Sequence, residues 1–164
     1  MVFVVVMAVL VVNARGAEAA SSFEKIIKHY EPIREALVDD STAGVAEHAR
    51  RIVEQTAKLA KNLDARHGGV AAERVAELRA LVPEIKTAAE QLATAQGIEA
   101  VREAFYGLTQ PLVRYRTLLA KPAADAQVAY CPMARKSWLQ PGGKLGNPYY
   151  GQSMAECGSF VEEG

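Results

Sequence analysis

The most distinctive chemistry in the sequence lies in two cysteine–methionine pairs near the C-terminus. Met133 follows Cys131 by two positions, and Met154 precedes Cys157 by three. Thiolates and thioethers are soft donors, which suit Cu(I) well and Mg²⁺, Ca²⁺ or Mn²⁺ poorly. Zinc sites usually draw on four Cys or His ligands, and no His lies in this part of the chain. The four sulfur-bearing residues therefore form a candidate Cu(I) site.

A disulfide is the alternative use of the same cysteines. They are the only two in the sequence, and an exported protein usually oxidises such a pair. A bond between Cys131 and Cys157 would stabilise the fold by roughly 3–4 kcal/mol in the chain-entropy description. Met133 and Met154 would then be ordinary packing residues. The spacing alone leaves both the metal site and the disulfide open.

The three histidines supply no second metal motif. His29, His48 and His67 fall in the first two predicted helices, and no two of them are spaced as helical ligand pairs are. We interpret each as a surface or interface residue. His48 becomes a candidate ligand only if the C-terminal part of the chain folds over the second helix.

Enzyme signatures are missing from the sequence. It contains no Gly-x-Ser-x-Gly turn, no glycine-rich phosphate loop and no Cys-x-x-Cys-His haem attachment site. A nucleophilic Cys131 would need a histidine beside it, and the sequence gives no sign of one. We therefore expect no catalytic residues and a protein that is not an enzyme.

The charge balance excludes a further class of partner. The 164 residues carry a formal net charge of zero and include no basic block. Nucleic-acid recognition normally needs a positive face, and a peripheral membrane protein normally needs a basic anchor. We therefore expect neither nucleic acid nor a membrane surface as a partner.

Residues 1–19 have the composition of a secretory signal peptide. A nearly unbroken apolar run covers residues 1–12, and Ala17-Glu18-Ala19 supplies a small-x-small cleavage pattern. The run is too short to span a bilayer, although no Lys or Arg precedes it. Cleavage before Ala20 and a periplasmic location are predicted, with an uncleaved N-terminal anchor as the alternative.

Residues 20–120 are predicted to form an antiparallel four-helix bundle. The first helix carries apolar side chains at intervals of three and four, namely Phe23, Ile26, Ile27, Tyr30, Ile33 and Leu37. Similar stripes follow in three later segments, with short connections that favour antiparallel neighbours. No strand pattern competes in this range, so the sequence predicts an all-α fold.

The expected helix ends rest on local signals. Residues 39–42 should break the first helix and cap the second, and His67-Gly68-Gly69 should end the second. The third helix should cover about residues 71–95. Pro83 and Pro111 should kink or locally break the last two helices.

Residues 121–164, hereafter the C-terminal lid, differ in composition from the helices. They are rich in Pro, Gly and aromatic residues and show no helical period. Disordered segments are poor in aromatics, so we expect an irregular but ordered lid of the same domain, with Trp138, Tyr149 and Tyr150 packed on the helices. Residues 147–151 should form a turn that folds the second Cys/Met pair back onto the first.

The lid resembles a known signature. The residues that carry the resemblance are Tyr130-Cys131-Pro132-Met133-Ala134, Trp138-Leu139, Asn147-Pro148-Tyr149-Tyr150-Gly151, Met154 and Cys157-Gly158. The pattern is similar to that of a bacterial domain-of-unknown-function family, which occurs as stand-alone exported proteins and at the C-terminus of periplasmic adaptor subunits of copper/silver-type RND efflux systems. Residues 30–40 and 102–112 resemble its first and last helices.

The chain departs from that family in two places. The stretch between Met133 and Trp138 is shorter, and Tyr130 stands where many members have His. The resemblance implies heavy-metal handling. We therefore expect an exported module that binds Cu(I) or Ag(I) through Cys131, Met133, Met154 and Cys157, and buffers it or passes it to an efflux adaptor or another periplasmic metal-handling protein. The alternative is a structural or protein-interaction domain with a Cys131–Cys157 disulfide and no metal.

Overall fold

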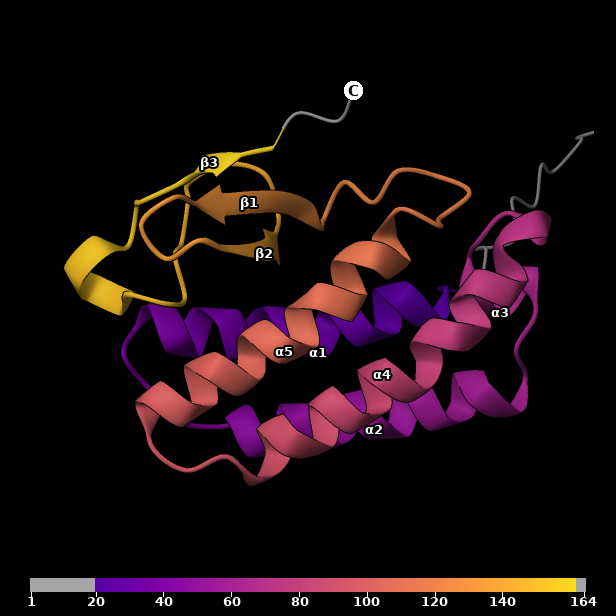
Figure 1. Ribbon diagram of the computed structural model, residues 1–164, viewed down its shortest axis with the longest axis horizontal. Coiled ribbons are helices and arrows are strands. Elements are labelled where there is room, and N and C mark those ends of the chain that lie inside the picture. The colour runs from indigo at the N-terminus through magenta and orange to yellow at the C-terminus, as the bar shows by residue number, and fades with distance from the viewer. Residues whose placement is uncertain (1–19, 162–164) are drawn as a thin grey trace, which may run out of the picture.

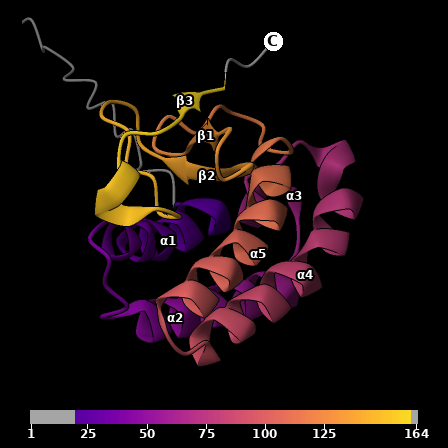
Figure 2. The same ribbon diagram turned by 60° about the vertical axis from the view of Figure 1, so that its left-hand side comes forward.

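The body of the molecule is a set of packed helices. The computed structural model describes residues 20–161, so the predicted signal peptide lies outside the described residues. In the described range, the long helices are α1 (Ser22–Val38), α2 (Val45–Lys61), α4 (Val75–Thr94) and α5 (Ile98–Arg116), and α3 (Ala65–Gly68) is short. Each long helix runs back along the one before it (Figures 1 and 2). The predicted helical body is confirmed, and within residues 20–161 no helix is both long and apolar enough to cross a membrane.

The predicted break after the first helix is confirmed, but residues 39–42 do not cap the second helix as expected. α1 begins with a capping box, in which Ser21 and Glu24 each accept a hydrogen bond from the other's backbone N–H. The helix ends at Val38, and Asp40 adopts a φ of +52°. α2 then starts from Gly44, which has a φ of +75° and no capping side chain. Residues 39–42 therefore end one helix without capping the next.

The predicted end of the second helix is wrong. α2 ends at Lys61, and Asp64 starts the separate helix α3 by accepting a 2.7 Å hydrogen bond from the N–H of His67. The carboxylate of an extended Asp satisfies an N–H that would otherwise lack a partner, so a new helix begins there. Gly69, with a φ of +67°, ends α3 instead of α2. A 3₁₀ turn, η1 (Ala72–Arg74), leads into α4.

The prolines do not break their helices. α4 continues through Pro83 and α5 through Pro111, as α1 does through Pro32. A proline inside a helix costs about 3 kcal/mol. Burying one large apolar side chain contributes about 1.5–3 kcal/mol, and Val82 and Ile85 are both buried beside Pro83. Packing therefore outweighs the local cost.

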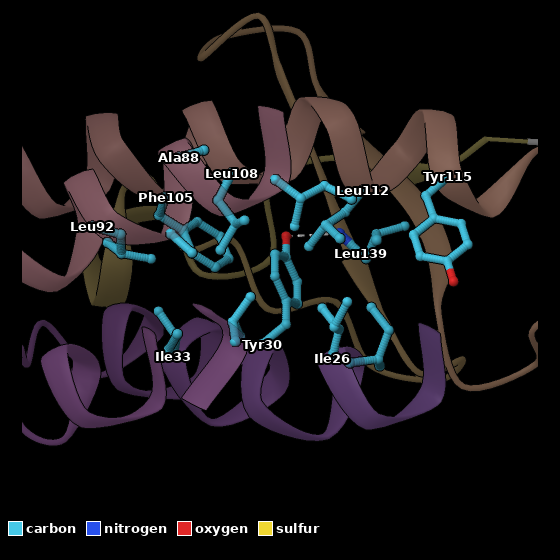
Figure 3. Packing of buried hydrophobic residues seen from close by; sticks show 14 of the residues in the cluster. Ile26, Tyr30, Ile33, Ala88, Leu92, Phe105, Leu108, Leu112, Tyr115 and Leu139 are labelled. Atoms are coloured by element: carbon cyan, nitrogen blue, oxygen red, sulfur yellow. Dashed lines mark hydrogen bonds between the residues drawn. The ribbon is translucent and has the colours of Figure 1, made fainter. Parts of the chain in front are cut away.

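The core fills the space between the long helices. Figure 3 shows Ile26, Tyr30 and Ile33 of α1 facing Leu108 and Leu112 of α5. Aromatic pairs span the same interface. The ring of Tyr30 stacks on that of Phe105 with centroids 4.7 Å apart, and Phe23 meets Tyr115 edge-on at 5.1 Å. The apolar stripe read from the first helix is the buried face.

The lid is not irregular, which corrects the all-α prediction. Within residues 121–161 it contains a small antiparallel sheet of β1 (Gln127–Cys131), β2 (Lys136–Gln140) and β3 (Ser159–Phe160), in the order β2-β1-β3. A 3₁₀ turn, η2 (Gly151–Met154), precedes β3. A tight reversal between β1 and β2 lets the two strands pair, with Ala129 opposite Trp138. Pairing satisfies backbone groups that an irregular buried lid would leave without partners.

The sheet packs on the helices through its edge strand β2. This strand contacts α5 and α1, while β1 and β3 lie farther out (Figure 1). The N–H of Leu139 donates to the hydroxyl of Tyr30 at 3.2 Å, the dashed contact in Figure 3. Trp138 and Tyr149 are buried and Tyr150 is half-buried. The prediction that these aromatics pack on the helices is confirmed.

Candidate metal centre

The β1–β2 hairpin positions the first cysteine. Cys131 is the last residue of β1, and its side chain is fully buried. The chain reverses over residues 132–135, helped by a φ of +54° at Arg135. The N–H of Ala134 then points back and donates to the Cys131 sulfur at 3.4 Å. The hairpin turn therefore wraps backbone amides around this sulfur.

The predicted turn brings the second cysteine to the first. The side-chain oxygen of Asn147 accepts a 2.9 Å hydrogen bond from the N–H of Tyr149, which makes an Asx turn. The chain then passes through η2, and the N–H of Cys157 donates to the carbonyl of Met154 at 3.0 Å. The sulfurs of Cys131 and Cys157 lie 3.0 Å apart, and both cysteines are free thiols. The expected return of the second pair onto the first is confirmed for the cysteines.

Asn147 links the two cysteines, a role that the sequence did not reveal. Its side chain is fully buried, and its amide nitrogen donates to the carbonyl of Cys157 at 3.0 Å. The same side chain hydrogen-bonds the sulfur of Cys131. Its own N–H donates to the carbonyl of Ala155 at 2.7 Å. The only sequence signal was its place before Pro148, which indicates a turn and nothing more.

The two thiols differ in acidity. Burial raises the pKa of Cys131, but hydrogen bonds from the Cys157 thiol, the amides of Ala134 and Met133 and the side chain of Asn147 together hold this pKa below its ordinary value. The pKa of Cys157 is raised, chiefly because its thiol donates to Cys131. Cys131 is therefore the thiol of the pair that loses its proton first, and Cys157 is the one that keeps it. A thiolate is both the metal-binding and the nucleophilic form of cysteine.

The methionines lie at the rim of the pair. Met133 is 65% exposed and Met154 is 36% exposed. The backbone N–H of Met133 acts to lower the pKa of both cysteines, so the residue is adjacent to the pair although it is largely exposed. Among residues 20–161, no three or more His, Cys, Asp or Glu side chains gather as a metal site. A metal at this position would depend on the two cysteines and on thioethers.

The histidines stand apart from the cysteines. The sheet packs on α5 and α1, so the lid is not seated on α2, where His48 lies. His48 instead contacts His29 of α1. The condition under which His48 would join the cysteine site is therefore not met, and His29 and His48 lie at the contact between α1 and α2.

Two buried arginines on the helices hold the lid in place, and sequence reasoning missed both. Arg34 of α1 donates to the carbonyl of Gly146 at 3.0 Å. Arg102 of α5 donates to the carbonyl of Pro148 at 2.9 Å and forms an ion pair with Asp40. These contacts flank Asn147 in the chain. Their position in the sequence could have revealed them, because each arginine falls within the apolar stripe of its helix.

Comparison with known proteins gives a match for the helical body but not for the lid. No curated protein and no solved structure matches the chain. A family model described as "Protein of unknown function (DUF3347)" matches residues 26–119, which is more than half of the sequence. The match runs from α1 to just beyond α5, so Cys131, Met133, Met154 and Cys157 follow it in the chain. The chain belongs to the DUF3347 family of proteins of unknown function.

Proposed function

We propose that the protein is an exported module that binds a soft monovalent ion, Cu(I) or Ag(I), as cargo. Cys131 and Cys157 are the principal ligands, and Met133 and Met154 complete the set. The observation that carries the proposal is the meeting of the two cysteine sulfurs at 3.0 Å, beneath a hairpin whose amides favour the thiolate. The module buffers the ion or delivers it to a periplasmic efflux partner.

The donor set suits such an ion. Thiolates and thioethers are soft ligands, and Cu(I) needs no oxygen donor. Two sulfurs on one tetrahedral ion, each bonded at about 2.3 Å as in zinc–thiolate sites, lie roughly 3.8 Å apart. The pair at 3.0 Å must therefore open slightly to admit an ion. Cys157 can supply this movement because it is half-buried in a loop, whereas Cys131 is fixed at the end of β1.

The exposed thioethers fit a site that exchanges its ion with another protein. Met133 and Met154 are exposed residues close in the chain to Cys131 and Cys157. Their rotamers are not fixed by the core, so they can turn toward an ion held by the cysteines. The efflux partner and the periplasmic location rest on the resemblance of the lid to adaptor-fused domains and on the composition of residues 1–19.

A disulfide-stapled interaction domain is the second candidate, and the same distance favours it. Cys131 and Cys157 are 26 positions apart, and a thiolate lying against a thiol is the arrangement from which a disulfide forms once an oxidant is present. Oxidation would fix η2 and β3 to the hairpin and abolish soft-metal binding. The two candidates differ in the state of the thiols in the exported protein.

Cu(I) competition on the reduced full chain tests the proposal. The wild type should take up about one Cu(I) and hold it against a weak Cu(I) chelator, and it should ignore Mg²⁺ and Ca²⁺. Cys131→Ser and Cys157→Ser should each cause the largest loss of affinity, because thiolates supply charge as well as softness. Met133→Leu and Met154→Leu should cause a smaller loss.

The matched control is Ser159→Ala, an exposed change in the same segment that removes no sulfur. Helical circular dichroism should show that all variants remain folded. Failure of the reduced wild type to retain Cu(I), or equal binding by a double cysteine variant, would refute the metal site. Protein recovered from the periplasm should begin at Ala20 by intact mass, and a free-thiol count of zero there would favour the disulfide.

A further inference from the structure

A second pair of metal-ligand side chains meets on the helical body, away from the cysteines. His29 of α1 and His48 of α2 face each other across the contact between these helices, with their Nδ1 atoms 3.2 Å apart. The ring centroids lie 5.5 Å apart and the ring planes make an angle of 41°. Both residues are half-buried, so one side of the pair is open to solvent.

The spacing of the two nitrogens matches that of two ligands on one ion. Two imidazole nitrogens bound to a tetrahedral Zn²⁺ at about 2.0–2.1 Å lie roughly 3.3 Å apart. The Nδ1 atoms already stand at 3.2 Å. When both neutral rings carry their proton on Nε2, both Nδ1 lone pairs are free, and an ion beside the line between them can bind both if the rings turn toward it. We propose that His29 and His48 form a surface site for a borderline divalent transition metal, bound through both Nδ1 atoms and completed by water.

The donor type separates this site from the one in the lid. Imidazole suits Zn²⁺, Ni²⁺ and Cu²⁺, whereas Mg²⁺ and Ca²⁺ require oxygen ligands and Cu(I) favours sulfur. Because no third His, Cys, Asp or Glu joins the pair within residues 20–161, two protein ligands are available and the other positions are open. The inference does not rest on the proposed function of the cysteines.

The charges around the pair act on His29. Burial lowers the pKa of His29, and the neighbouring His48, Lys28 and Arg51 lower it further, while Glu54 opposes them. The neutral imidazole is the form that binds a metal. The cations Lys28 and Arg51 also repel an incoming ion, although Arg51 is partly neutralised by its ion pair with Glu54 at 3.2 Å. Because two cations lie beside two protein ligands, the site should bind its ion more weakly than a three-ligand site.

Zn²⁺ titration of the full chain, followed through the side-chain nitrogen resonances of histidine, tests the site. These resonances report the imidazoles alone, so Zn²⁺ held by the lid cysteines does not disturb the reading. Zn²⁺ should shift Nδ1 of His29 and of His48 together. His67 is the internal control, because its exposed ring pairs with Asp64 and faces no second histidine.

Variants sharpen the test. In His29→Gln, the Zn²⁺ concentration needed to shift His48 should rise roughly tenfold or more, and His48→Gln should affect His29 in the same way. His67→Gln should change neither titration. Unmoved Nδ1 resonances in the wild type, a shift of Nε2 in their place, or an unchanged titration in both variants would show that the contact is only a hydrogen bond between helices.

Discussion

The helical body and the lid bury different kinds of side chain. Between the long helices, the buried residues are mostly apolar, as on the α1–α5 face. In the lid, Gln140 and Asn147 are as deeply buried as Trp138. The side chain of Gln140 accepts hydrogen bonds from the indole N–H of Trp138 and the backbone N–H of Gly146, and it donates one to the carbonyl of Lys144. The lid is therefore held by a network of buried hydrogen bonds, whereas the helical body is held by buried apolar surface.

The difference extends to the surface where the two regions meet. The body buries two arginines, Arg34 and Arg102, and both donate to lid carbonyls. Within residues 20–161, no buried side-chain nitrogen or oxygen lacks a hydrogen-bond partner. Apolar contacts tolerate small shifts, but such a network has one arrangement. The position of the cysteine pair is therefore specified by polar groups on both sides of the junction.

The largest effect is expected from Trp138→Ala, which asks whether the two regions unfold together. Truncating a fully buried tryptophan should cost about 3–5 kcal/mol. If the lid and the helices form one cooperative unit, the helical circular dichroism signal should melt at a clearly lower temperature. Tyr130→Ala is the control, because this side chain is exposed on the neighbouring strand and should cost under about 1 kcal/mol. An unchanged helical melt would show that the lid is only loosely coupled.

The helices could be predicted because their signal is local and repeated. In α1 every third or fourth residue is apolar, so a single misplaced residue would not change the assignment. The ends were less predictable, because Asp64 caps a separate helix, α3, before the chain reaches the glycines at 68 and 69. Such a cap contributes a few tenths of a kcal/mol to about 2 kcal/mol.

The sheet could not be predicted because its strands are short and one of them, β2, is buried on both faces. Trp138, Leu139 and Gln140 are consecutive and all buried, so β2 lacks the alternation that marks a half-exposed strand. The composition predicted order in the lid, and the turn predicted the approach of the cysteines. The contacts of Arg34 and Arg102 join residues far apart in the chain, which spacing in one sequence does not reveal.

The next largest effect is expected from Arg102→Gln, which weakens the junction and leaves both regions otherwise intact. Arg102 donates to the carbonyls of Pro148 and Leu37 and to the carboxylate of Asp40. Hydrogen bonds to charged groups contribute about 1.5–3 kcal/mol, so a loss of that order is expected. Fluorescence of Trp138 should shift to the red at lower denaturant concentration than the helical signal is lost.

Arg114→Gln is the matched control on the same helix. Arg114 pairs with Glu84 at the surface, where about half of each side chain is exposed, and such pairs contribute about 0–1 kcal/mol. Equal destabilisation by the two substitutions would mean that the contacts of Arg102 contribute no more to stability than a surface ion pair does. Cu(I) affinity should fall in Arg102→Gln and stay unchanged in Arg114→Gln if the network positions the cysteines.

The smallest expected effect is a change in how stability depends on pH. It concerns Asp40, the carboxylate that pairs with Arg102. The hydrogen bond from Arg102, followed by one from the backbone N–H of Gln152, lowers the pKa of Asp40. A carboxyl whose pKa is depressed in the folded state stabilises the protein above its unfolded pKa, about 4, and loses that contribution as pH falls through the folded value. Asp40→Asn should therefore destabilise the protein at neutral pH, and its free energy of unfolding should approach that of the wild type as pH falls below about 4. Denaturant unfolding at a series of pH values measures this convergence. In the Arg102→Gln background the substitution should have a smaller effect, because the ion pair is already broken and the hydrogen bond from the backbone N–H of Gln152 remains. A constant difference between Asp40→Asn and wild type across the acid range would show that Asp40 supports the lid by packing alone and that its charge contributes nothing to the junction.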